Sequence, residues 1–282
     1  MQKTLLNIIS EKTGISSVQI EKTLKLFEQG ATVPFISRYR KEATGGLDEV
    51  QILSLKNESE RLLEIEKRKE TILKTIEEQG KLTDVLKVQI ENTYILSDLE
   101  DIYLPYKPKR KTRATQAKEK GLEPLADIIM QQKSINLSVE AKKYLNEQVV
   151  SVEDALQGAR DIIAEIINEN TGARNKIRNL FNQKALIRSK VVKGKEEEGE
   201  KYQDYFDTTD PLRKCPSHRL LAIRRGEKEG FLKVSVFPPE EEAIEILTRF
   251  LIKNNNESAQ QLELAIKDSY KRLLQPSIET EF

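Results

Sequence analysis

The sequence has one cysteine and one histidine among its 282 residues, Cys215 and His218. A lone cysteine excludes an internal disulfide and suits a reducing compartment. The stretch CPSH brings the two residues close together, but a zinc site needs further Cys or His ligands, which this chain does not have. We therefore expect no metal site, and we interpret His218 as a residue near a helix start.

Long apolar runs are also lacking. No stretch approaches the roughly 20 apolar residues of a membrane-spanning helix. The first residues, MQKTLLNIISEKTG, are too polar for a secretory signal. We expect a soluble, cytoplasmic protein with no membrane partner.

The chain has almost no net charge, because 47 Lys and Arg face 46 Asp and Glu, which leaves +1. This balance excludes a global field that would attract nucleic acid, so any such binding must come from local patches. Charged residues still make up 33% of the chain, which is typical of helices with wide solvated faces.

Catalytic motifs are absent from the sequence. The stretch VVKGKEEEG (191–199) lacks the frame of a phosphate-binding loop, and there is no nucleophile elbow. Asp98, Glu100 and Asp101 cluster, but acids in the first turn of a helix are favoured by its dipole. We predict that this chain is not an enzyme and needs no cofactor.

Helical periodicity dominates what is present. Asp48 to Gln79 contains no proline or glycine, and its stripe of Ile and Leu predicts one helix of roughly 45 Å. Ser151 is placed to cap a core helix whose apolar face runs from Val152 to Ile167. Alternation and β-branching at 186–192 and 231–237 predict at most a small β element. The fold class is therefore mainly α, as a multi-helical elongated scaffold.

The sequence suggests two regions and a monomer. Residues 1–130 would form an N-terminal helical region with the long helix and a helix-turn-helix, and residues 131–282 a second helical region. Ser217 is expected to cap a helix that ends at Gly226, although Leu220–Ile223 would also suit a hairpin with 231–237.

One basic cluster stands out in LPYKPKRKTRATQAKEKG (104–121), where seven cations and one acid, Glu119, give a local charge of +6. The cations are Lys107, Lys109, Arg110, Lys111, Arg113, Lys118 and Lys120. Tyr103 and Tyr106 precede them and are candidates for stacking on bases. We predict contacts with phosphates that do not depend on base sequence, and a solvated basic loop is the alternative.

The end of this cluster has the pattern of a helix-turn-helix, in TRATQAKEKGLEPLADII (112–129). Ala117 and Gly121 have the spacing of the tight turn, and Pro124 can open the second helix. The pattern is loose, and many helix pairs share it.

A second basic stretch, ATVPFISRYRKEATGGLDEVQ (31–51), combines Arg38, Arg40 and Lys41 with Tyr39. Packing positions such a short helix. We therefore predict a structural corner in which Phe35, Ile36 and Tyr39 are buried. In this interpretation the arginines pair with acids such as Glu42 or Asp48, and phosphate contact is the lesser possibility.

Together these stretches resemble the bacterial Tex family of transcription accessory proteins, and the resemblance covers essentially the whole chain. The blocks that carry it are GATVPFISRYRKEATGGLDEVQ (30–51), EEQGKLT (77–83), LEDIYLPYKPKRKTRATQAKEKGLEPLAD (99–127), VVKGKEEEGEKYQDYF (191–206) and DPLRKCPSHRLLAIRRGEKEGF (210–231). The first and third blocks are the most specific.

The resemblance implies a part of a longer, mostly helical protein linked to transcription. Family members also carry an RNase H-like YqgF domain, helix-hairpin-helix motifs and an S1 domain, to which their nucleic-acid binding is largely attributed. This chain ends about where YqgF is expected, so we expect a fragment that lacks those parts. The helix-turn-helix carries over onto roughly Thr112–Met130. The signature at Arg38–Lys41 carries over with no known role.

Two functional hypotheses follow. In the first, the chain is nucleic-acid-associated and adds auxiliary, non-specific phosphate contacts through the basic cluster. In the second, it is a docking scaffold for the transcription machinery and binds no nucleic acid itself.

Overall fold

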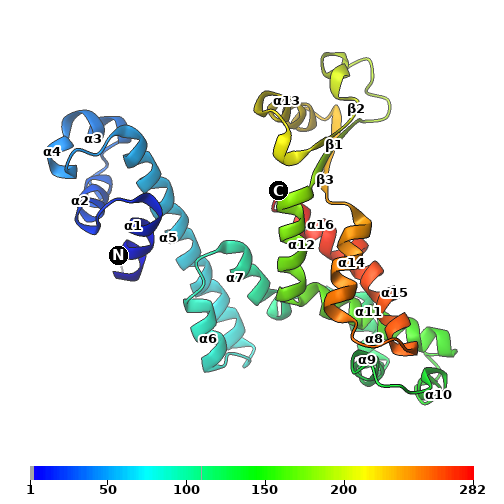
Figure 1. Cartoon of the computed structure of the whole chain (residues 1–282). Helices are drawn as coiled ribbons and strands as arrows, with labels where there is room; N and C mark the ends of the chain where they lie inside the picture. Colours follow the sequence, from blue (N-terminus) through cyan, green and yellow to red (C-terminus); the bar gives the residue numbers. More distant parts are fainter. Residues whose placement is uncertain (1–2, 109) are drawn as a thin grey trace. The chain divides into compact units, whose positions relative to one another are not determined.

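The computed structural model describes residues 3–108 and 110–282. Its contacts divide the chain into two compact units, Met1–Tyr103 and Leu104–Phe282. The mainly α fold class is confirmed, since helices make up most of the described residues and one small antiparallel sheet accompanies them (Figure 1). Each unit is described by itself.

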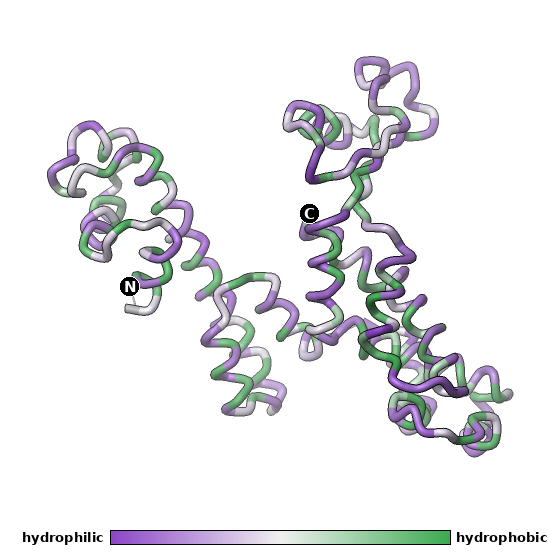
Figure 2. The backbone as a smooth tube through the Cα atoms, viewed as in Figure 1, coloured by the Kyte–Doolittle hydropathy of each residue, from purple (hydrophilic) through white to green (hydrophobic). Residues whose placement is uncertain are grey.

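The first unit is built along the long helix α5 (Glu49–Glu78), which confirms the predicted helix over Asp48–Gln79. Asp48 caps α5 by accepting from the Gln51 N–H, and the Gln51 side chain accepts from the Asp48 N–H. Hydrophobic and hydrophilic residues alternate along α5 (Figure 2), as a helix with one packed face requires. The other helices of this unit are α1 (Lys3–Thr13), α2 (Ser17–Glu28), α3 (Val33–Tyr39), α4 (Lys41–Thr44), α6 (Asp84–Glu91) and α7 (Leu96–Tyr103).

The second unit is organised around α11 (Val152–Glu169), the predicted core helix. Ser151 caps it, and Ala155, Ile162 and Ile163 are fully buried. Helices that precede α11 in the sequence and helices that follow it both pack against it. The helices of this unit besides α11 are α8 (Arg113–Glu119), α9 (Glu123–Met130), α10 (Leu137–Lys142), α12 (Thr171–Lys184), α13 (Ser217–Lys228), α14 (Glu240–Leu251), α15 (Glu257–Ser269) and α16 (Gln275–Glu279), with a π-turn at Tyr270–Leu274 and 3-10 turns at Leu104–Tyr106, Glu200–Tyr205 and Leu212–Lys214.

The sheet has the strand order β2-β1-β3, with both pairings antiparallel. Strands β1 (Leu186–Val191) and β3 (Leu232–Phe237) confirm the predicted β element. Strand β2 (Asp207–Pro211) was not predicted, because its sequence DTTDP is polar and forms a strand only by pairing with the edge of β1. The helix predicted from Ser217 is present as α13, although it continues to Lys228 and Ser217 makes no side-chain cap.

The predicted division between residues 130 and 131 falls inside the second unit. The helices before it, α8 and α9, both pack on α11 and bury Ala117 and Leu125 there. The first 3-10 turn of the second unit begins at Leu104.

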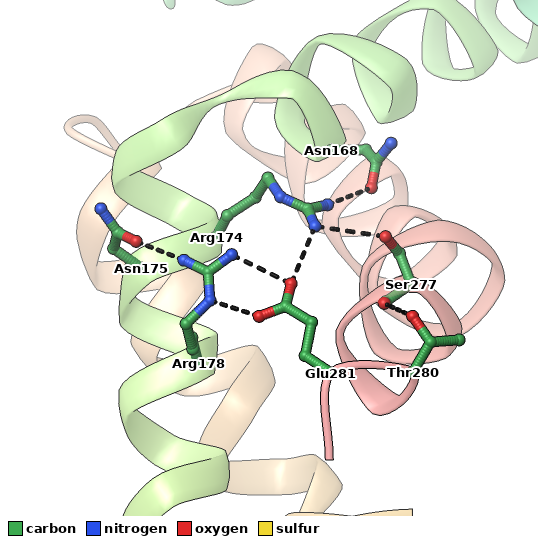
Figure 3. A network of polar contacts seen from close by, with 7 residues as sticks. All are labelled: Asn168, Arg174, Asn175, Arg178, Ser277, Thr280 and Glu281. Atoms are coloured by element: carbon green, nitrogen blue, oxygen red, sulfur yellow. Dashed lines mark hydrogen bonds and ion pairs between the residues drawn. The ribbon is translucent and has the colours of Figure 1, made fainter. Parts of the chain in front are cut away.

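A partly buried ionic network joins α12 to α16 and to Glu281, which follows α16, within the second unit (Figure 3). Arg178 donates to both carboxylate oxygens of Glu281, from Nε at 2.6 Å and from Nη2 at 3.0 Å. Arg174 lies 3.4 Å from the same carboxylate and donates to Ser277 at 3.2 Å. Only 4% of Arg174 is exposed, so Glu281 balances a cation held out of water.

In the first unit, Glu58 ties α5 to α1. Its carboxylate accepts from Lys12 at 2.6 Å and from Arg61 at 2.5 Å, and only 7% of its side chain is exposed. Burial by itself raises the pKa of Glu58, but the hydrogen bonds from Arg61 and Lys12 outweigh it and hold the pKa below its usual value.

We expect Glu281→Gln to lower the free energy of unfolding of the second unit by about 1–3 kcal/mol, since it removes the charge opposite a buried guanidinium. Urea denaturation measures this. The matched control is Glu245→Gln, because Glu245 pairs with Arg249 on an exposed surface where 57% and 78% of the two side chains are accessible. The control should change stability by less than about 0.5 kcal/mol, and an equal loss in both variants would contradict the network's role.

Glu58 gives a pH prediction. Because its folded pKa lies below its unfolded value, its contribution to stability is complete above about pH 4.5 and is lost as the pH falls through the lower folded pKa. Glu58→Gln should therefore melt at a lower temperature than the parent at about pH 7, and the difference should shrink on acidification below about pH 4.5. Thermal denaturation across this range tests it, and a difference that does not change with pH would disprove the assignment.

Candidate nucleic-acid interface

The basic cluster lies on a loop and along α8 as far as its C-cap, Lys120. Pro105 and Pro108 interrupt helix formation in the loop. Thr112 then caps α8 by accepting from the Thr115 N–H at 3.1 Å, and the Thr115 hydroxyl accepts from the Thr112 N–H at 2.7 Å. This capping box fixes Arg113 as the first residue of the helix, with its side chain exposed.

The structure separates the predicted cations into paired and unpaired ones. Lys111 lies 3.3 Å from Glu119, and Lys118 lies 2.5 Å from Glu123. Both pairs are exposed to water, where such an interaction contributes little, so either lysine can exchange its partner for a phosphate.

The unpaired cations are exposed, and none forms an ion pair with a carboxylate in the part of the chain that the structure describes. They are Lys107, Arg110, Arg113 and Lys120. Lys109, the seventh predicted cation, lies outside the described residues.

A hollow of about 340 Å³ lies between α8 and α11. Arg113 and Lys120 line it together with the amides of Gln116 and Gln157 and the carboxyl of Asp161. Burial raises the pKa of Asp161, the nearby Arg272 and Arg113 oppose that rise, and Asp268 adds to it. Because the carboxyls of Asp154 and Asp161 both line the hollow, a phosphate is better placed near Arg113 and Lys120 than beside these acids.

The two helices and the tight turn predicted between 112 and 130 are present. Gly121 takes the left-handed conformation of the turn, with φ of +78°. Gly158 of α11 permits the close packing, since a Cβ there would lie 2.3 Å from the Leu122 side chain. However, α9 exposes Glu123 and Asp127, and acids on this face do not suit a recognition helix in a DNA groove.

The two tyrosines before the cluster differ in exposure. Tyr103, the last residue of the first unit, is 7% exposed, and the Arg68 guanidinium lies 5.3 Å from its ring centroid. Its predicted stacking on a base does not fit this burial. Tyr106 is half-buried.

The predicted burial of the 31–51 stretch is right for Ile36 and wrong for two of its aromatic residues. Ile36 is fully buried, whereas Phe35 is 40% exposed and Tyr39 is 67% exposed. The helix α3 has only seven residues, and Ile36 and Ser37 occupy its core-facing side, so Phe35 and Tyr39 turn outward.

The predicted pairing of the signature arginines with acids is also wrong. Among the described residues, Arg38, Arg40 and Lys41 are exposed and form no ion pair with Glu42 or Asp48. Arg40 instead places its guanidinium 5.4 Å from the centroid of the Phe35 ring.

The other sequence candidates for chemistry are placed as follows. Glu100 accepts two hydrogen bonds from Arg68, at 2.5 and 3.0 Å, and His218 is exposed in the first turn of α13. Within the described ranges, no three His, Cys, Asp or Glu side chains are grouped as metal ligands would be. No helix in those ranges is long and apolar enough to cross a membrane.

Two family models match this sequence. The Tex-like protein N-terminal domain matches residues 3–77, and the Tex central region-like model matches residues 132–282, more than half of the chain. The basic cluster lies between the two matched segments.

Several relatives agree with these matches. The chain is 46% identical to the transcriptional accessory protein Tex of Neisseria gonorrhoeae over 84% of this chain and 31% of that protein. It is 43% identical to the uncharacterized protein YdcI of Bacillus subtilis over 97% of this chain and 39% of that protein. It is 27% identical to the human S1 RNA-binding domain-containing protein 1 over the whole chain and 30% of that protein. The chain thus spans only about a third of the length of these relatives.

Proposed function

Since the chain belongs to the Tex family, we propose that it is the N-terminal helical part of a transcription accessory protein, and that its basic cluster adds auxiliary contacts to nucleic-acid phosphates. The relatives' names support the association with transcription and nucleic acid. The observation that carries the contact proposal is the group of exposed, unpaired cations at Lys107, Arg110, Arg113 and Lys120 in a nearly neutral chain.

The contacts would be independent of base sequence. Lysine and arginine side chains reach phosphates from a loop and a helix edge without reading base edges. The acidic exposed face of α9 supports this, because it leaves the motif without a helix suited to read a groove. The proposal assigns no catalytic step, cofactor or membrane contact to the chain, and a cytoplasmic monomer stays a prediction.

A docking scaffold for the transcription machinery is the second candidate. Exposed apolar residues on α5 favour it, among them Val50 at 75%, Leu53 at 47% and Leu63 at 48%. A hollow of about 370 Å³ beside Leu63 is lined partly by Leu24 and Phe27 of α2. This candidate predicts no binding of nucleic acid by the chain.

The decisive experiment is fluorescence anisotropy with labelled single- and double-stranded DNA and RNA at two salt concentrations. The test variant changes Lys107, Lys109, Arg110, Lys111 and Arg113 to Gln. We expect the parent to bind more weakly at higher salt, with roughly 0.9 added to the negative log–log slope for each phosphate contacted on duplex DNA, and the variant to lose both affinity and slope.

The matched control changes five other exposed lysines without an ion pair to described carboxylates, so that the net charge falls equally. These are Lys25, Lys81, Lys142, Lys193 and Lys233. An equal loss in the control, or an affinity that does not depend on salt, would refute the proposed contacts. Absence of binding by every form would favour the docking scaffold.

The ion pairs at Lys111 and Lys118 give a second prediction with the opposite sign. Glu119→Gln combined with Glu123→Gln frees both lysines and removes two negative charges beside the cluster. Affinity for duplex DNA at low salt should rise by roughly 2- to 10-fold, and the salt dependence should become steeper. The same anisotropy titration measures it, and weaker binding would contradict the placement of the phosphates.

A further inference from the structure

The corner formed by α3 and α4 in the first unit has a backbone fixed by its core. Ile36 is fully buried, and Thr32 caps α3 by accepting from the Phe35 N–H. The Gln19 side-chain amide of α2 donates to the carbonyls of Thr44 and Gly45, at 3.1 and 3.3 Å. The corner is therefore rigid, and it presents its remaining side chains in a fixed arrangement.

Two aromatic rings occupy the outer side of this corner. Phe35 and Tyr39 lie one helical turn apart, with ring centroids 5.5 Å apart and planes inclined by 44°. Tyr39 keeps 67% of its surface exposed, although aromatic rings usually gain free energy by burial. A flat partner can therefore stack on it without any rearrangement of the corner.

Three cations surround these rings. Arg38, Arg40 and Lys41 are exposed and unpaired with carboxylates of the described chain, and Arg40 lies over the Phe35 ring. A hollow of about 420 Å³ adjoins Phe35 and Arg40, and the small residues Gly30 and Ala31 line it.

We propose that this corner binds single-stranded nucleic acid. A base would stack on Tyr39 and Phe35, and Arg38, Arg40 and Lys41 would hold the flanking phosphates. Exposed aromatic rings among unpaired cations are complementary to a nucleic-acid strand, because its bases are flat rings and its backbone is polyanionic. A duplex offers phosphates to the cations but keeps its base faces covered, so the rings favour a single strand.

This site is separate from the basic cluster of the second unit, and it is tested separately. The sequence contains no tryptophan, so Tyr39→Trp introduces a single reporter at the stacking position. The change is made in the variant that already carries Gln at Lys107, Lys109, Arg110, Lys111 and Arg113. Binding through the cluster is then weakened and the reporter is at Tyr39, so failure of either proposal is distinguishable from failure of the other.

The reporter is titrated with 12-nucleotide oligo(dT), with oligo(U) of the same length, and with a 12-base-pair duplex. We expect quenching by one or both single strands, and their relative affinity shows whether DNA or RNA is preferred. The affinity for the duplex, measured by the same quenching, should be at least roughly tenfold weaker. The control reporter is Val85→Trp on α6, since Val85 is 79% exposed and lies outside the corner; it should not be quenched.

Changing Arg38, Arg40 and Lys41 together to Gln should weaken binding and reduce the negative salt slope by about 2, as expected for three phosphates on a single strand. In the same five-Gln background without the reporter, Tyr39→Ala should weaken anisotropy-detected binding of the labelled single strands by roughly tenfold. The proposal is overturned by absence of quenching, by equal quenching with duplex or with the Val85 reporter, or by tighter binding of an acidic peptide, which would make the corner a protein-docking site.

Discussion

The burial of α11 is the constraint on which the second unit depends. Its apolar face accepts α8, α9 and α15, and Gly158 allows the Leu122 side chain to approach closer than any larger residue would permit. Helices that are distant in the sequence are thereby held on one core. The basic cluster owes its position to this packing, because α8 has too few residues to be stable alone.

Electrostatics in this molecule are a matter of local pairing rather than total charge. Arg174 and Glu58 are buried, and each has a partner of opposite charge from another part of its unit, Glu281 and Lys12, which offsets the cost of holding an ionic group out of water. The exposed side chains of Arg113 and Arg38 form no ion pair with a described carboxylate, although Asp161 lies near enough to Arg113 to interact with it. A chain with nearly equal numbers of both charges can thus contain two basic surfaces, because many of its acids form ion pairs or helix caps elsewhere.

The sequence predicts the long elements well, for identifiable reasons. Helix α5 has no proline or glycine, and α11 has an uninterrupted apolar face, so periodicity alone locates both. Strand β2 was not predicted, because it is its pairing with β1, and not its composition, that makes it a strand. The boundary between the two units at Leu104 depends on what α8 and α9 pack against, which composition does not encode.

The candidate sites were predicted less completely than the fold. The segment 104–121 was identified by charge counting, but the pairing of Lys118 with Glu123 depends on the turn at Gly121. At the corner, apolar composition suggested burial for Phe35 and Tyr39. Seven residues of helix have one narrow core face, and Ile36 occupies it, so the direction of the rings follows from packing that composition does not encode.

The close packing of Gly158 against Ala117 of α8 and against Leu122 has a thermodynamic consequence. Since α8 is locked onto α11 in the folded chain, the conformational entropy of ordering its cations is lost during folding rather than during association. A polyanion that binds the cations of α8 would bury little additional apolar surface, and the heat-capacity change of binding would therefore be small. The amide protons of α8 would exchange with solvent at rates set by the opening of α11. The basic surface on α8 and the core around α11 therefore belong to the same cooperative element.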